Sequence, residues 1–119
     1  MEEEVIELVG EKRGTTSVIL AGVHGDETCG LEAFKKLLPE LEIEAGRVFF
    51  IYANPLAIKA GKRFIEANLN RMLKNENLIT TKEKNSYEYN RAKFLKIYLN
   101  QAEALLDIHS SSNNQAGVF

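Results

Sequence analysis

The chain has 119 residues, of which 45% are hydrophobic and 27% are charged, and its formal net charge at pH 7 is −2. This length fits a single domain with a buried core, and the charge balance excludes a general nucleic-acid-binding protein, which needs a basic face. No apolar run approaches the ~18 residues that cross a bilayer, and the acidic N-terminus is unlike a secretory leader. Cys29 is the only cysteine and leaves no intrachain disulfide, so we expect a cytoplasmic protein with no membrane partner.

The first half of the chain predicts two strands, a helix and a third strand. Residues 5–9 and 16–21 are β-compatible, and the short polar connection between them predicts an antiparallel hairpin. From residue 28 apolar residues recur at three- and four-residue spacing and stop before Pro39, which predicts a helix. Residues 47–53 form a continuous apolar run, typical of a strand that is covered on both faces.

The second half predicts a loop, a helix and a last strand. The chain is polar and loop-rich from Asn54 to about residue 86. Residues 87–102 predict a helix because several side chains share one stripe, and residues 104–108 predict a short strand. Strands that alternate with helices predict an α/β fold, with a mixed, mostly parallel sheet and helices packed on it.

Both histidines of the chain follow predicted strands and have carboxylates near them. His24 and Glu27 form an H-x-x-E pattern, in which residues three apart on a helical turn can face one point. His109 follows the last predicted strand, and the ends of strands at one edge of an α/β sheet are where ligands bind. Two histidines and one carboxylate leave a fourth position open on catalytic zinc. The pattern therefore predicts a Zn²⁺ site, and the competing interpretation is a pair of hydrogen-bonded loop histidines.

Asp107 adds a further carboxylate to the predicted site. Residues two apart in a strand point to the same face, so Asp107 and His109 should project together. A carboxylate there can accept a hydrogen bond from a metal-bound histidine and fix its tautomer. We expect that histidine to be His24.

Five short motifs occur together in an order and spacing that resemble one known family. They are Gly-Val-His-Gly-Asp-Glu at 22–27, Ala-Asn-Pro at 53–55, Arg-Phe-Ile-Glu at 63–66, Asn-Leu-Asn-Arg at 68–71 and Asp-Ile-His at 107–109. Together they resemble the succinylglutamate desuccinylase/aspartoacylase family, which has a zinc-carboxypeptidase-like fold. The resemblance extends from about residue 16 to residue 115.

The resemblance implies a zinc-dependent deacylase that hydrolyses the amide of a small N-acyl amino acid, of succinyl or acetyl type. It implies that the three residues of the predicted site are the zinc ligands and that Arg63 polarises the scissile carbonyl. Asn70 and Arg71 correspond to the pair that holds a substrate carboxylate. These roles suit the chemistry, because a guanidinium binds carboxylates through two parallel donors and stabilises a developing oxyanion.

The sequence departs from the family pattern in two respects. Asn68 stands where many members carry Asp. The glutamate that acts as general base in the family has no counterpart here, since the spacing assigns neither Glu66 nor Asp26 to that role. We therefore expect residues 1–119 to be the N-terminal part of a zinc-dependent deacylase catalytic domain, able to bind metal but catalytically poor. Such a part should leave a sheet edge uncovered and form homo-oligomers through it.

Three other functions stay open. A zinc carboxypeptidase-like peptidase uses the same three ligands, and a non-catalytic metal-binding module would not need the missing glutamate. A cysteine hydrolase would use Cys29 with His24 or His109, and would need the nucleophile and the base in hydrogen-bond contact.

Overall fold

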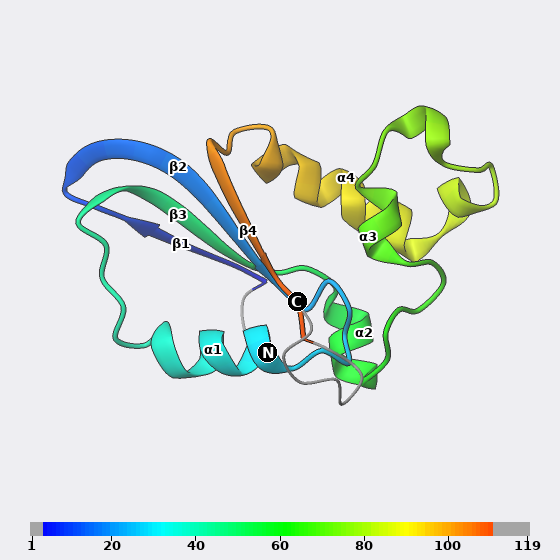
Figure 1. Ribbon diagram of the computed structural model, residues 1–119, viewed down its shortest axis with the longest axis horizontal. Coiled ribbons are helices and arrows are strands. Elements are labelled where there is room, and N and C mark those ends of the chain that lie inside the picture. The colour runs from blue at the N-terminus through cyan, green and yellow to red at the C-terminus, as the bar shows by residue number, and fades with distance from the viewer. Residues whose placement is uncertain (1–3, 111–119) are drawn as a thin grey trace.

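The computed structural model describes residues 4–110 of the chain, which form a four-stranded sheet in the order β1-β3-β2-β4 (Figure 1). The strands are β1 (Val5–Val9), β2 (Lys12–Ala21), β3 (Ala45–Tyr52) and β4 (Ala104–Ile108). β1 is antiparallel to β3, whereas β3 is parallel to β2 and β2 is parallel to β4. The prediction of a mixed, mostly parallel α/β sheet is confirmed.

The predicted hairpin is wrong, because β3 lies between β1 and β2. The turn that joins β1 to β2 instead bonds to the start of β3, through the Gly10 N–H and the Gly46 carbonyl at 2.8 Å. The physical reason lies in the apolar run of β3, which is buried most fully when the strand has a neighbour on each side. The short connection correctly indicates opposite strand directions but does not determine which strands pair.

Helices cover the two faces of the sheet, and both long helices lie where the sequence predicts them. On one face α1 (Cys29–Leu37) packs Phe34 against Phe50 of β3. On the other face α4 (Tyr87–Leu99) places Leu95 in a core with Leu20 of β2. The alternating side chains of the central strands therefore enter two separate cores.

The stretch between β3 and α4 contains short helices where the sequence predicts loop. Their ends are marked by asparagines, since Asn54, Asn68 and Asn75 each accept a backbone N–H and cap a first turn. Helices of three to six residues are too short for an amphipathic period to be recognised. They are α2 (Pro55–Ala60), α3 (Leu69–Met72), η1 (Glu76–Leu78) and η2 (Glu83–Asn85).

β4 is an edge strand beside β2, and it brings two distant parts of the chain together. Ala21 at the end of β2 pairs with Ile108 at the end of β4, so the segments that follow both strands meet at one edge of the sheet. Leu105 and Leu106 on β4 are each 54% exposed, which matches the uncovered edge expected from the sequence. Among residues 4–110, no helix has the length and apolar character to cross a membrane.

Candidate metal centre

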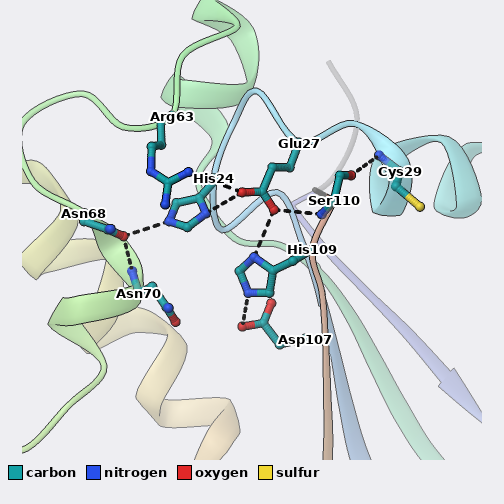
Figure 2. Close-up of polar contacts among 9 residues, drawn as sticks. All are labelled: His24, Glu27, Cys29, Arg63, Asn68, Asn70, Asp107, His109 and Ser110. Carbon is teal, nitrogen blue, oxygen red and sulfur yellow. Dashed lines mark hydrogen bonds and ion pairs between the residues drawn. The ribbon is translucent and has the colours of Figure 1, made fainter. Parts of the chain in front are cut away.

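His24, Glu27 and His109 come together beyond the ends of β2 and β4 (Figure 2). Each offers one potential ligand atom, and these atoms all lie within 4.8 Å of one another. The Glu27 carboxylate lies between the two rings, with Oε2 2.7 Å from His24 Nδ1 and Oε1 3.0 Å from His109 Nδ1. His24 and Glu27 are buried, whereas the His109 side chain is 36% exposed.

A tight turn after β2 places the first two of these residues. Gly22 has a φ of +73°, and a Cβ there would lie 2.5 Å from Ile58, so only glycine fits this bend. The Glu27 N–H donates to the His24 carbonyl at 3.2 Å, which closes a turn and turns both side chains to one side. Because α1 begins at Cys29, the pair lies in the turn before the helix rather than in its first turn.

Asn68 holds the outer nitrogen of His24. Its Oδ1 lies 2.8 Å from His24 Nε2 and also accepts the Asn70 N–H at 3.1 Å. The second contact identifies the oxygen as the atom that faces the ring, so His24 donates from Nε2. His24 Nδ1 is then directed at the shared centre.

Asp107 holds the outer nitrogen of His109, with Oδ2 2.9 Å from His109 Nε2. The expectation that Asp107 would support His24 is therefore wrong. Asp107 lies near the end of β4 and His109 directly follows that strand. Because residues two apart in a strand project to the same face, their side chains come into contact. The other carboxylate oxygen of Asp107, Oδ1, is buried and has no hydrogen-bond partner within residues 4–110.

The electrostatics of the cluster favour an ionised Glu27 and a protonated His109. Burial acts to raise the pKa of Glu27, but the Ser110 N–H at 2.8 Å and the hydrogen bonds of His24 and His109 outweigh it, so that pKa is lowered. Burial acts to lower the pKa of His109, but the hydrogen bonds and charges of Asp107 and Glu27 outweigh it and raise that pKa. The Glu27 shift thus reflects the hydrogen-bond donors around its carboxylate, whereas the His109 shift reflects the two carboxylates beside its ring.

The donor set fits a bound cation. Both nitrogens of His24 face acceptors, the Asn68 amide oxygen and Glu27, and both nitrogens of His109 face Asp107 and Glu27. A neutral imidazole donates only one hydrogen bond, so the inner Nδ1 positions call for added protons or for one metal ion in their place. Two imidazole nitrogens, a carboxylate and outer hydrogen bonds on both rings are typical of a divalent transition-metal site.

Arg63 and Asn70 lie beside the cluster. Arg63 Nη1 is 3.6 Å from Glu27 Oε2, and the half-exposed guanidinium lies beside His24 and Glu27 (Figure 2). The Arg63 carbonyl accepts the Gly25 N–H at 3.3 Å, which ties this loop to the turn after β2. Asn70 follows Asn68 at the start of α3 and has an exposed side chain.

Arg71 lines a hollow next to the cluster, which it shares with Asn68. It is exposed, and Phe64 and Lys82 line the same hollow. The structure thus brings Arg63 and Asn70 to the edge of the cluster and places Arg71 at the neighbouring hollow.

Cys29 has no place in this arrangement. Its backbone N–H donates to Ser110 Oγ at 3.1 Å, while its sulfur points away from both histidines (Figure 2). Within residues 4–110 no hydrogen bond joins the thiol to an imidazole, so the contact required of a cysteine hydrolase is missing.

Two contributions to the site were not predicted from the sequence. The Ser110 N–H is a backbone donor, and no side-chain motif could have indicated it. Glu88 is a fully buried carboxylate on α4 that binds the loop carrying Arg63. A signal for Glu88 was available, because it lies three residues before Arg91 on the inward stripe of the helix, where an apolar side chain is expected.

The sequence matches a known family over most of its length. A family model described as the Succinylglutamate desuccinylase/Aspartoacylase catalytic domain matches residues 13–117. A succinylglutamate desuccinylase of Shewanella woodyi is 39% identical over 93 residues, which is 75% of this chain and 27% of that protein. One from Pseudomonas paraeruginosa is 37% identical over 73 residues, 58% of this chain and 22% of that protein. The chain thus spans about a quarter of the length of these relatives.

Solved structures agree. Succinylglutamate desuccinylase from Vibrio cholerae superposes with a TM-score of 0.77 and 30% identity, over 91% of this chain and 35% of that one. A tripeptide-bound Csd4 cell shape determinant from Helicobacter pylori gives 0.78 at 22% identity, over 98% of this chain and 28% of that one, a likeness of fold. The chain belongs to the succinylglutamate desuccinylase/aspartoacylase family.

Proposed function

We propose that the chain is the metal-binding part of a zinc-dependent hydrolase that removes the acyl group from an N-acyl amino acid. His24, Glu27 and His109 are the zinc ligands in this proposal, and the fourth position is left for water. The observation that carries it is the convergence of two Nδ1 atoms and a carboxylate, with each outer ring nitrogen held by Asn68 or Asp107. A zinc ion there would lower the pKa of a bound water and polarise the amide carbonyl.

The residues around the cluster have separate roles in this proposal. Asn68 and Asp107 keep the two rings in the Nε2–H tautomer, so that both Nδ1 lone pairs face the metal. Arg63 donates to the carbonyl oxygen as negative charge develops on it, since its half-exposed guanidinium lies beside Glu27. Asn70 and Arg71 bind the carboxylate of the amino acid, for which the planar fork of Arg71 is suited.

The substrate class follows from the family. Relatives named succinylglutamate desuccinylases suggest N-succinylglutamate or a similar N-acyl amino acid as the first compound to test. Those relatives are about three times as long as this chain, so turnover is proposed for a longer protein of which residues 1–119 form the N-terminal part of the catalytic domain. The 119-residue chain itself is proposed to bind zinc with little turnover. The two carboxylates at the centre, Asp107 and Glu27, already contact the histidine rings, so neither is free to act as the general base.

The experiment is the metal content of the purified chain after incubation with zinc and removal of excess metal. About one zinc per chain is expected for the wild type, and almost none for His109→Ala, which removes one of three ligands. Lys36→Ala, an exposed change on α1, is the matched control and should keep its zinc. A wild-type chain that is folded by circular dichroism and holds no zinc contradicts the proposal.

A further inference from the structure

Glu88 is a charged side chain that lies outside the metal cluster and has no exposed surface. Its carboxylate accepts three consecutive backbone N–H groups, those of Ile65 at 2.8 Å and of Glu66 and Ala67 at 2.9 Å each. A fourth donor, the Asn54 side-chain amide, lies at 3.0 Å. Successive N–H groups that converge on one point form an anion-binding concavity, and here the anion comes from the protein itself.

The segment held in this way is the loop between α2 and α3. Most of it lies at the surface, where Phe64 and Ile65 are 38% and 39% exposed. Such a loop has no ladder of its own to fix its backbone, and in the absence of other contacts it would sample many conformations. Three hydrogen bonds to one buried carboxylate remove that freedom.

The contact between the loop and α4 is reciprocal. Glu66 Oε1 accepts the Tyr87 N–H at 2.7 Å and so caps the first turn of the helix, just before Glu88. The first turn is also where the helix dipole favours a carboxylate. The loop and the N-terminus of α4 therefore hold each other.

The residues that Glu88 binds, 65–67, lie in the sequence between two residues that contact the candidate metal centre. Arg63 is two residues before Ile65, and its Nη1 reaches Glu27 at 3.6 Å. Asn68 directly follows Ala67, and its Oδ1 lies 2.8 Å from His24 Nε2. A displacement of this backbone segment would move both groups together.

We propose that Glu88 is a positioning residue, whose buried carboxylate organises the 61–68 loop so that Asn68 orients His24 and Arg63 faces the cluster. The link to metal binding rests on the function proposed above, whereas the link to loop order does not. A carboxylate is a poor choice for filling space, since its burial costs desolvation, but an apolar side chain in its place would leave four donors without an acceptor. The arrangement is selective for an ionised group, because only a carboxylate can accept from all four donors at once.

The first test is amide hydrogen exchange in the wild-type chain, kept metal-free with a chelator. The N–H groups of residues 65–67 are expected to be protected, although they belong to a surface loop. Exchange at those three positions as fast as in an unstructured peptide would overturn the proposal, whether or not the chain binds metal.

The second test uses Glu88→Gln, which preserves size but turns an NH₂ group toward a backbone N–H. Exchange at residues 65–67 should become about tenfold faster, and the dissociation constant for Co²⁺, followed by its d–d absorption, should rise about tenfold. Leu95→Ala is the matched control, because Leu95 is buried on the same helix but belongs to the core against the sheet. It should lower the melting temperature while leaving loop exchange and Co²⁺ affinity within about twofold of wild type.

The outcomes separate the two proposals. Unchanged loop exchange in Glu88→Gln, or an equal loss of Co²⁺ affinity in Leu95→Ala, overturns the positioning role. A wild-type chain that binds no Co²⁺ contradicts the proposed function. The exchange experiments still test whether Glu88 orders the 61–68 loop. Should Glu88→Gln fail to fold, Glu88→Asp takes its place, because it keeps the charge but is too short to reach every donor.

Discussion

The two histidines reach one point from very different surroundings. His24 follows β2, which has a neighbouring strand on each side, and the residue is only 4% exposed. His109 follows β4, an edge strand, and its side chain is 36% exposed. His24 is held by the neutral amide of Asn68, whereas His109 is held by the carboxylate of Asp107. The difference teaches that burial fixes the position of His24, while the charge of Asp107 compensates for the more exposed setting of His109.

The largest effect on Zn²⁺ affinity is expected when the residues that hold the outer ring nitrogens, Asn68 and Asp107, are each changed to the other's type. A carboxylate raises the basicity of a ligating imidazole more than an amide does, so Asp107→Asn should weaken Zn²⁺ binding about 10- to 100-fold. Asn68→Asp should strengthen it about tenfold for the same reason. Dissociation constants from competition with a chromophoric chelator measure both changes. Asp26→Asn is the control, because it removes one exposed negative charge next to Glu27 in the sequence. An equal loss of Zn²⁺ affinity in this variant would mean that net charge, and not the hydrogen bond to His109, sets the affinity.

The pH dependence of the metal-free chain should depend on His109. Its pKa in the folded chain is raised above 6.5, since Asp107 and Glu27 outweigh the effect of burial. The folded state therefore binds this proton more tightly, and the gain in stability is full below pH 6.5 and is lost as the pH rises through the folded-state pKa.

Calorimetry with a chelator present should accordingly show a melting temperature that falls by a few degrees as the pH rises from below 6.5 through the raised pKa of His109. His109→Gln should remove most of that fall. Zinc-saturated chain should show the opposite trend, because the metal competes with the protons on both rings. A fall that persists in His109→Gln would assign the effect to another group.

The smallest expected effect concerns self-association through β4, the edge strand that precedes His109. Within residues 4–110, β4 pairs only with β2 and carries half-exposed leucines, and such an edge favours pairing between copies of the chain. Leu105→Lys should weaken self-association in sedimentation velocity, and should change stability by no more than about 0.5 kcal/mol. Val9→Lys is matched to it, since Val9 is 61% exposed on β1, which lies at the opposite edge of the sheet. Equal effects of both changes would argue against pairing through β4.

Much of this molecule could be predicted from local patterns. Periodicity was sufficient for α1, α4 and the strands, and the spacing of His24, Glu27 and His109 singled out residues that do come together. Strand order was not predictable, because the place of β3 between β1 and β2 depends on burial in the whole sheet. The sequence predicts that Asp107 contacts His24, whereas Asp107 contacts His109. Which of two nearby rings a carboxylate contacts depends on distances in the folded chain, which spacing in the sequence does not give.

His24 and His109 are 85 residues apart in the chain (109 minus 24), and β4 is the last of the four strands within residues 4–110 to leave the ribosome. A nascent chain that has emerged only as far as α4 can offer His24 and Glu27 but not the third potential ligand. Domains begin to fold during synthesis, so the sheet can form around β2 and β3 before β4 arrives. Docking of β4 would then complete the centre, and a metal ion held there would retain the last strand in its place.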